Sequence, residues 1–372
     1  MSLPRPNILF INSIKSFAGG EIWMITLAKE LLKKDYKVIL ACPPGAEIIG
    51  PANGTGIEIH TLKISGDLNP ITISRLKALF KKCNISIVIA NVGKDIRLSG
   101  LAAKFSPDVS VIALHQVDRP LKNNLRYRFT YNYLADTIVV NSISTKKTIM
   151  KSAPWLMYNK IRVIYHGIDP GKYSDENTAK IRTSLGLSEE DFVIGFAGRL
   201  NVQKGITFML DAFKIVSDKY KNVHLLIAGT GDLENSIKDF ASKYDLENRI
   251  HLLGFRKDIP ELMRTFDVFL LPSLWEGFGI VLIEAMAAGK ACVATNTSSI
   301  PEIVADGKSG LLVPAENTEL IAEALLKLIS DSSLREKFGV EGQKIVQQKF
   351  TIGRMIDDYE MLFQELINLK RN

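Results

Sequence analysis

The sequence predicts an α/β protein built from two doubly wound parallel sheets in tandem. Short apolar runs typical of strands alternate with helical patterns along the chain, as in parallel sheets covered by helices. The length of 372 residues is too great for one ordinary core and suggests two domains. A turn-rich segment, HGIDPGKYSD at residues 166–175, separates two series of such elements.

The first series predicts strands at residues 8–12, 37–42, 87–91, 109–115 and 137–141, with helices at 22–33 and 98–105. The second predicts strands at 192–197, 224–228, 250–254, 268–272 and 291–295, with helices at 206–220, 233–244, 259–264 and 280–288. Three more helices are predicted at 318–328, 333–348 and 352–369. Since sheets of this type bind ligands at the carboxyl ends of their strands, we expect the active site there.

We expect an N-terminal domain at residues 1–168 and a C-terminal domain at 169–351. The remaining segment, 352–372, has apolar residues at helical spacing and is expected to pack back on the N-terminal domain.

Charge is divided unevenly along the chain. The formal net charge is +7. The first 165 residues contain 23 Lys and Arg against 10 Asp and Glu, a net of +13, and the remainder contains 24 against 30, a net of −6. This asymmetry indicates that the first half meets an anionic membrane, nucleic acid or a phosphorylated substrate, unless it is only a solvated basic surface.

The sequence also argues against several other classes of protein. No apolar stretch reaches the length needed to cross a bilayer, and no signal peptide is evident, so we expect a cytoplasmic protein. Cys42, Cys83 and Cys292 are widely spaced and are predicted to be free thiols. Neither metal-ligand spacing nor a Gly-x-Ser-x-Gly nucleophile motif is present, so no metal site and no hydrolase chemistry are predicted.

One glycine-containing loop follows the first strand of each series. GRLNVQKG at residues 198–205 places Gly198, Arg199 and Lys204 at the end of a strand, where two cations beside helical N–H groups can hold a diphosphate. A surface salt bridge is the alternative. In SFAGGE at residues 16–21, Gly19 and Gly20 allow N–H groups to approach a phosphate, although a simple turn explains them equally well.

Two carboxylates lie eight residues apart in PSLWEGFGIVLIEAMAAG at residues 272–289. Glu276 stands at the Gly277-Phe278-Gly279 turn, and Glu284 lies on the helix that follows. The glycines leave N–H groups unshielded near a helix start, which favours an anionic or hydroxyl-rich ligand. The alternative is a buried helix whose Glu276 caps its own first turn.

Smaller signals come from three other strand ends. Gly229 in GTGDL and Phe255 after Gly254 could frame a flat base, or could belong to ordinary turns. His115 ends a predicted strand of the first sheet, where a histidine can act on a ligand, although a lone histidine is more often structural.

Taken in order, these motifs resemble glycosyltransferase family 4, retaining sugar transferases of the GT-B fold. The resemblance covers nearly the whole chain and includes VVNS at residues 139–142, KIRVIYHGID at 160–169 and IPEIVADGKSGLLV at 300–313. It implies two Rossmann-like domains facing each other across a cleft, the first on the acceptor side and the second binding the nucleotide sugar. It also implies transfer of a hexose-type sugar from a nucleotide-diphosphate sugar to a glycan or lipid-linked acceptor, in synthesis of cell-surface polysaccharide, lipopolysaccharide or glycolipid.

The resemblance also implies roles for individual residues. Arg199 and Lys204 match the pair that binds the donor diphosphate, and Glu284 matches the carboxylate that holds the ribose. Glu276 and His115 match residues beside the transferred sugar, so the expected catalytic residues are Arg199, Lys204, Glu276 and His115. The other residues expected to bind the nucleotide sugar are Gly19, Gly20, Gly198, Gly229, Phe255, Gly277, Phe278, Gly279 and Ile280. A UDP-sugar is the favoured donor, with GDP- and ADP-sugars as alternatives, and neither a cofactor nor a metal is expected.

The chain departs from the family pattern at two places. Ser298 and Ser299 stand where the family often has two glycines before Pro-Glu, which puts the donor contacts of that loop in doubt. His166 stands where the linker usually has asparagine.

Residues 119–134, RPLKNNLRYRFTYNYL, interleave cations with aromatic residues. Such a segment suits an anionic membrane surface, and predicts peripheral association with the inner face of the membrane. A helix that packs its aromatics inward is the alternative. No nucleic-acid module is recognised, so no nucleic-acid partner is expected. Two rival functions are a GT-B-fold sugar-nucleotide epimerase and a non-catalytic protein that binds nucleotide sugars.

Overall fold

The computed structural model describes residues 5–17, 19–174 and 179–371. They form two compact units. Unit 1 contains the described residues up to Tyr165 and those from Ile352 onward, and unit 2 contains those between His166 and Thr351. Within the described residues, no helix is both long and apolar enough to cross a membrane.

Unit 1 is a seven-stranded sheet in the order β3-β2-β1-β4-β5-β6-β7, with every neighbouring pair parallel. Its strands are β1 (Asn7–Ile11), β2 (Val38–Cys42), β3 (Glu58–Thr61), β4 (Ile85–Ala90), β5 (Ser110–His115), β6 (Thr137–Val140) and β7 (Ile161–Val163). Alternate residues of β1 face opposite sides of the sheet, so Ile8 and Phe10 join one core and Leu9 and Ile11 the other.

Helices cover both faces of this sheet. They are α1 (Gly19–Lys33), α2 (Ile49–Ala52), α3 (Pro70–Lys82), α4 (Gly93–Ala103), α5 (Leu125–Phe129), the π-helix η1 (Thr130–Leu134), α6 (Ile143–Ser152), the 3₁₀ turn η2 (Tyr158–Lys160) and α15 (Ile352–Arg371). Helices α1, α2 and α15 contribute to one core, and α3, α4 and α6 contribute to the other.

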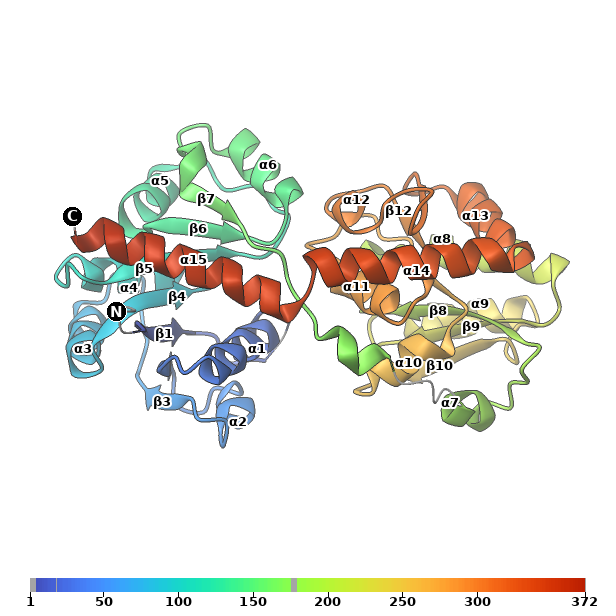
Figure 1. Ribbon diagram of the computed structural model, residues 1–372, viewed down its shortest axis with the longest axis horizontal. Helices are drawn as coiled ribbons and strands as arrows, with labels where there is room; N and C mark the ends of the chain where they lie inside the picture. The colour runs from blue at the N-terminus through green and yellow to red at the C-terminus, as the bar shows by residue number, and fades with distance from the viewer. Residues whose placement is uncertain (1–4, 18, 175–178, 372) are drawn as a thin grey trace. The chain divides into compact units, whose positions relative to one another are not determined.

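The C-terminal helix α15 belongs to unit 1, although the chain reaches it only after unit 2. It lies beside α1 on one face of the sheet (Figure 1). Tyr359 and Phe363 are fully buried in the core that α1 also lines. Polar contacts also hold the helix, because the Tyr36 hydroxyl donates to Glu360 at 3.0 Å and Lys370 pairs with Asp136 at 3.1 Å.

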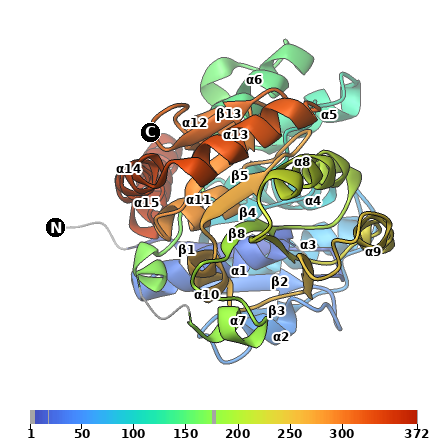
Figure 2. The same cartoon turned by 90° about the vertical axis from the view of Figure 1, so that its right-hand side faces the viewer.

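Unit 2 is a six-stranded parallel sheet in the order β10-β9-β8-β11-β12-β13. Its strands are β8 (Phe192–Ala197), β9 (Val223–Ala228), β10 (Ile250–Gly254), β11 (Val268–Leu271), β12 (Ala291–Thr295) and β13 (Gly310–Val313). Its helices and 3₁₀ turns are η3 (Pro170–Tyr173), α7 (Ala179–Ser184), η4 (Val202–Lys204), α8 (Ile206–Lys219), α9 (Glu234–Lys243), α10 (Ile259–Thr265), α11 (Ile280–Ala287), α12 (Ile300–Ile303), α13 (Thr318–Ser330) and α14 (Ser332–Lys349). Helices α8 and α13 lie side by side (Figure 2). The expected pair of doubly wound parallel sheets is therefore confirmed.

Several elements were not predicted from the sequence. Strand β3, with the sequence EIHT, is a partly exposed edge strand, and β7 has only three residues. Helix α3 begins at a proline that follows the capping residue Asn69, whose side chain accepts from Thr72 N. The helix expected at 98–105 instead begins at Gly93, because the segment before residue 98 contains charged residues that conceal its periodicity.

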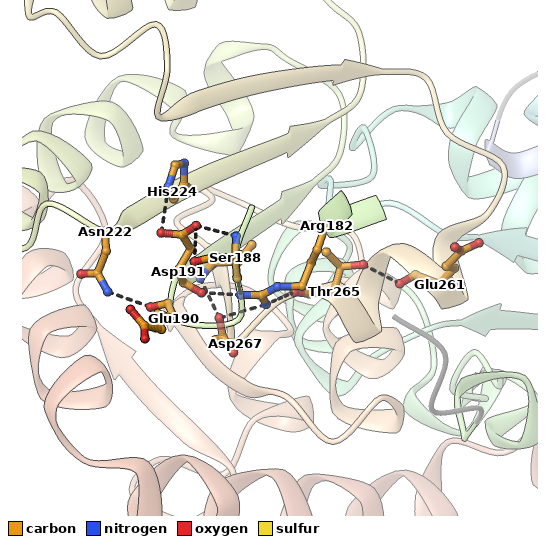
Figure 3. Close-up of polar contacts among 10 residues, drawn as sticks. Arg182, Ser188, Glu190, Asp191, Asn222, His224, Glu261, Thr265 and Asp267 are labelled. Carbon is orange, nitrogen blue, oxygen red and sulfur yellow. Dashed lines mark hydrogen bonds and ion pairs between the residues drawn. The ribbon is translucent and has the colours of Figure 1, made fainter. Parts of the chain in front are cut away.

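A polar network joins the amino ends of the unit 2 strands (Figure 3). The backbone N–H of Val193 donates to Asp267 at 2.7 Å, and Arg182 lies 3.6 Å from the same carboxylate. His224 on β9 lies 3.2 Å from His251 on β10, measured between Nδ1 and Nε2. These contacts lie at the opposite end of the strands from the expected ligand site.

The histidine pair predicts a pH-dependent stability. Burial lowers the pKa of both His224 and His251 below the ordinary value of 6.5, so the unfolded chain binds more protons than the folded one in mildly acidic solution. The two neutral histidines make their full contribution to the free energy of unfolding above about pH 6.5. This contribution is lost as the pH falls from that value through the folded-state pKa values. We expect the free energy of unfolding, measured with urea, to decrease from pH 7.5 to 5.5 less steeply in His251→Gln than in the unmodified protein. Equal slopes would contradict this.

Candidate functional site

The loop expected to bind the diphosphate, residues 198–205, meets the loop that carries Glu276 at the switch point of the unit 2 sheet. From β8 the chain proceeds to β9 and β10 on one side, whereas β11 pairs with β8 on the other. The loops after β8 and β11 therefore diverge from neighbouring strands, which is where open α/β sheets form their ligand crevice.

Lys204 and Glu276 are joined across this switch point. Lys204 Nζ donates a hydrogen bond to Glu276 Oε1, and the Ser273 hydroxyl donates to the same oxygen at 2.8 Å. The side chains are only 15% and 6% exposed, so the charges compensate each other away from most of the solvent. Glu276 does not cap its own helix, because α11 begins after Gly279 without a side-chain cap.

Two glycines allow the strand-end loops to pack backbone against backbone. A Cβ on Gly205, whose φ is +65°, would lie 2.0 Å from the carbonyl oxygen of Pro272. A Cβ on Gly229 would lie 1.8 Å from the carbonyl oxygen of Gly198. A side chain at either position would separate the loops that follow β8, β9 and β11.

Four hydroxyl side chains, one on the last residue of β12 and three in the segment directly after it, form hydrogen bonds with the loop that carries Glu276, and we refer to them as the hydroxyl ladder. Its bonds are Thr295 Oγ1 to Ser273 O at 2.5 Å, Thr297 Oγ1 to Leu274 O at 3.2 Å, Glu276 N to Ser298 Oγ at 3.2 Å, and Ser299 Oγ to Phe278 O at 2.8 Å. The loop is thus held along its length by side chains from the neighbouring strand end. This role is not evident from the sequence, since the partners lie 21 to 23 residues apart.

The two serines that depart from the family pattern belong to this ladder. Ser298 has a φ of +48°, a left-handed conformation that glycine adopts without the cost borne by other residues. Ser299 is fully buried. Each serine adds a hydrogen bond to the Glu276 loop that glycine cannot make.

Glu284 has a different environment from Glu276. It lies on α11 and accepts a hydrogen bond of 3.0 Å from the Tyr173 hydroxyl on η3. Burial raises the pKa of Glu284 to about 7, despite the opposing effect of this bond. Tyr173, which the sequence analysis missed, therefore fixes a carboxyl group that titrates near neutral pH.

Phe278 anchors the turn before α11. Its buried ring lies 5.2 Å from the His166 ring and 6.0 Å from the Phe350 ring, measured between centroids. Gly279 follows with a φ of +92°, and Ile280 begins the helix and is exposed. The backbone of residues 277–280 therefore lies at the start of α11, held by a buried aromatic cluster.

Two other predicted residues are exposed and follow strands of the unit 2 sheet. Arg199 follows β8, and no salt bridge involves it among the described residues. Phe255 follows β10 and is 72% exposed, so its ring is free to stack on a flat ligand.

The remaining predicted residues lie in unit 1. Gly19 and Gly20 are the first residues of α1, and a Cβ on Gly20 would lie 2.9 Å from Asn91 Nδ2. Since α1 follows β1 and Asn91 follows β4, the glycines lie at the switch point of the unit 1 sheet. Asp95, missed in the sequence analysis, is fully buried beside this point and accepts from Ser13 N at 2.9 Å.

His115 ends β5, as expected. Its Nε2 lies 3.0 Å from the carbonyl oxygen of Arg119, so Nε2 donates and Nδ1 is left as an acceptor. Burial lowers the pKa of His115, which keeps the ring neutral at physiological pH.

Two family models match the chain. The model described as Glycosyltransferase Family 4 matches residues 17–172, and the model described as Glycosyl transferases group 1 matches residues 177–345. An uncharacterized glycosyltransferase of Methanocaldococcus jannaschii is 30% identical over 69% of this chain and 68% of its own length.

Two further comparisons extend this similarity. A capsular polysaccharide biosynthesis glycosyltransferase of Staphylococcus aureus is 32% identical over 63% of this chain, and the match spans 63% of the relative's own length. The crystal structure of Anabaena HepE in complex with UDP superimposes with a TM-score of 0.83 over 97% of this chain and 99% of that one. At 22% identity, this likeness shows that the fold is shared.

Proposed function

This chain belongs to the group 1 glycosyltransferases, and we propose that it moves a hexose-type sugar from a UDP-sugar to a glycan or lipid-linked acceptor with retention of anomeric configuration. The observation that carries this proposal is the pairing of Lys204 with Glu276 at the switch point of the unit 2 sheet. The family resemblance assigns two loops to the donor, and this pairing puts one residue of each loop in direct contact with the other.

The donor site is assigned to unit 2. We propose that Arg199 and Lys204 bind the diphosphate, that Glu284 accepts hydrogen bonds from the ribose, and that Phe255 stacks on the base. The backbone of Gly198 and of residues 277–280 would bind the phosphates and sugar, and the backbone of Gly229 would help to frame the base. The UDP bound in HepE supports a uridine nucleotide as the donor.

Breaking the bond from the sugar to the diphosphate places negative charge on the leaving phosphate oxygens. Arg199, Lys204 and the N–H groups at a helix start can stabilise that charge. We propose front-face attack, in which the departing phosphate accepts the acceptor hydroxyl's proton while the acceptor oxygen bonds the anomeric carbon. Glu276 and neutral His115 would position the sugar. Gly19 and Gly20 would lie against the phosphates or the acceptor.

Incubation with UDP-, GDP- and ADP-sugars labelled in the sugar tests this function. Transfer, or slow donor hydrolysis without an acceptor, is expected with one nucleotide. An epimerised sugar would identify the rival epimerase, and binding without turnover would identify a non-catalytic protein. A flat thermal-shift response to every nucleotide would contradict the donor site itself.

The hydroxyl ladder predicts that the rigidity of the Glu276 loop affects turnover. Thr297→Val keeps the shape of the side chain but removes its hydrogen bond, and should lower kcat about tenfold, as expected for about 1.4 kcal/mol. Thr297→Ser retains the hydroxyl and is expected to retain most activity. UDP affinity should change little in both variants, because the diphosphate and ribose contacts lie on other residues. Equal kcat in the two variants would contradict the role of this bond.

The acceptor side is proposed to contact an anionic membrane surface through residues 119–134. The large apolar and aromatic residues of this segment divide between two environments. Tyr131 is buried, whereas Leu125, Phe129 and Tyr133 are 82%, 44% and 64% exposed. The exposed three recur every four residues along α5 and η1, with Arg126 and Arg128 among them. This apolar stripe beside cations suits insertion at the headgroup level.

Vesicle sedimentation tests this surface. The unmodified protein is expected to bind phosphatidylserine-containing vesicles more than neutral ones, and the double variant Leu125→Ser, Phe129→Ser should lose most of this binding because it removes the inserted apolar area. Phe105→Ser is the matched control, since Phe105 is 64% exposed but lies outside the stripe. Indifference to lipid charge, or an equal loss in the control, would contradict the proposal.

A further inference from the structure

Three potential metal ligands from two separate segments meet at the amino edge of the unit 1 sheet. Glu58 and His60 lie two residues apart on the edge strand β3, so their side chains share one face. Cys83 follows α3, immediately before the turn into β4. Glu58 Oε1, His60 Nε2 and Cys83 Sγ all lie within 4.8 Å of one another.

The distances among these atoms are close to those of a tetrahedral zinc site. Cys83 Sγ lies 3.8 Å from His60 Nε2 and 3.9 Å from Glu58 Oε1. Bond lengths of about 2.3 Å for Zn–S and about 2.0 Å for Zn–N and Zn–O place such atoms about 3.5 Å apart around a tetrahedral ion. His60 Nε2 and Glu58 Oε1 are 2.6 Å apart, and would separate to about 3.3 Å to admit the ion between them.

The surroundings leave a coordination position open and orient the carboxylate. Lys37 Nζ lies 3.0 Å from Glu58 Oε2, so the lysine holds one oxygen while the other points toward His60. The Glu58 and His60 side chains are 42% and 20% exposed, whereas Cys83 is buried. A water molecule can therefore reach the fourth position from the exposed side.

We propose that Glu58, His60 and Cys83 bind a divalent cation of the zinc class, with water as the fourth ligand. A thiolate and an imidazole favour Zn²⁺ over Mg²⁺ and Ca²⁺, which prefer oxygen ligands. On binding, the Cys83 S–H bond is replaced by a metal–thiolate bond and the proton passes to solvent. No electron is transferred.

The site is independent of the proposed transferase chemistry, because it lies at the amino edge of the sheet and ligands of such sheets bind at the carboxyl edge. Its expected effect is structural. The ion would connect the short edge strand β3 to the turn between α3 and β4. Spacing along the sequence predicted no metal ligands, because Cys83 lies far from the other two residues until the chain folds.

Titration of tag-free protein with Co²⁺ tests the proposal directly. We expect a thiolate-to-cobalt charge-transfer band that saturates at one equivalent and is removed by excess Zn²⁺. Cys83→Ser should abolish the band, and His60→Gln should weaken Co²⁺ binding at least about tenfold. Cys42→Ser is the matched control, since Cys42 is also a buried free cysteine of unit 1. It should retain the band.

A second measurement does not depend on the variants' folding. Zn²⁺ should raise the Tm of the unmodified protein, and Mg²⁺ at the same concentration should not. Absence of the cobalt band in the unmodified protein, or its persistence in Cys83→Ser, would overturn the proposal. Sugar transfer is not used as a readout, so failure here leaves the proposed transferase function unaffected.

Discussion

Lys204→Ala is expected to lower kcat/KM for sugar transfer at least about 100-fold, equivalent to about 3 kcal/mol of transition-state stabilisation. We assign Lys204 to the diphosphate, where negative charge develops as the sugar leaves. Its charge already lies in a partly buried position, so little reorganisation is needed when the bond breaks. Steady-state kinetics with the donor identified by the labelled-sugar panel would measure the loss.

The ion pair with Glu276 requires a second variant. Removing Lys204 alone leaves the Glu276 carboxylate with the Ser273 hydroxyl but without its cation, which could disturb the loop by itself. In Lys204→Ala, Glu276→Gln that uncompensated charge is absent. If the lysine acts on the diphosphate, the double variant stays inactive and binds UDP as weakly as Lys204→Ala does.

Lys219→Ala is the matched control, because Lys219 is an exposed lysine at the other end of the following helix, α8. It should retain full activity. Near-normal turnover by a Lys204→Ala variant with an intact circular dichroism spectrum would contradict the assigned role. Recovery of UDP affinity in the double variant would show that the lysine serves the loop and not the diphosphate.

Phe363→Ala is expected to lower the free energy of unfolding of unit 1 by about 3–5 kcal/mol. Phe363 is fully buried, and its ring lies 5.8 Å from the Tyr359 ring and 6.1 Å from the Tyr36 ring. Truncation leaves a cavity between α15 and the residues that it covers. Urea unfolding can be followed by fluorescence of Trp23, whose ring lies 6.1 Å from that of Tyr359.

Met361→Ala provides the control on the same helix. Met361 is 72% exposed, so its truncation should change stability by less than about 0.5 kcal/mol. A similar loss in both variants would indicate an effect on the helix itself. Equal stability of Phe363→Ala and the unmodified protein would contradict the docking of α15 in the unit 1 core.

Much of the fold could be predicted from local patterns. Buried strands such as β8 and β12 are continuous apolar runs bounded by turns, and their positions follow directly from composition. Strand β3 was missed because its polar residues suit an edge, which shows no apolar run. Strand β13 was missed because its four residues, GLLV, are too few to distinguish a strand from a segment of loop.

The candidate site was predicted only in part. Arg199, Lys204 and Glu276 could be selected because glycine-containing loops after strands mark the carboxyl edge of a sheet. The bond between Lys204 and Glu276 could not, since 72 residues separate them. The same applies to Tyr173 and Glu284, which are 111 residues apart.

The sequence by itself determined the alternation of strands and helices, the presence of two sheets and the residue types at their strand ends. These properties depend on residues that are neighbours along the chain. The tertiary structure decided which of these residues meet: Lys204 with Glu276, Tyr173 with Glu284, the hydroxyl ladder with the loop after β11, and α15 with the unit 1 core. Such contacts depend on strand order and packing, because only a folded sheet brings distant loops to a common edge.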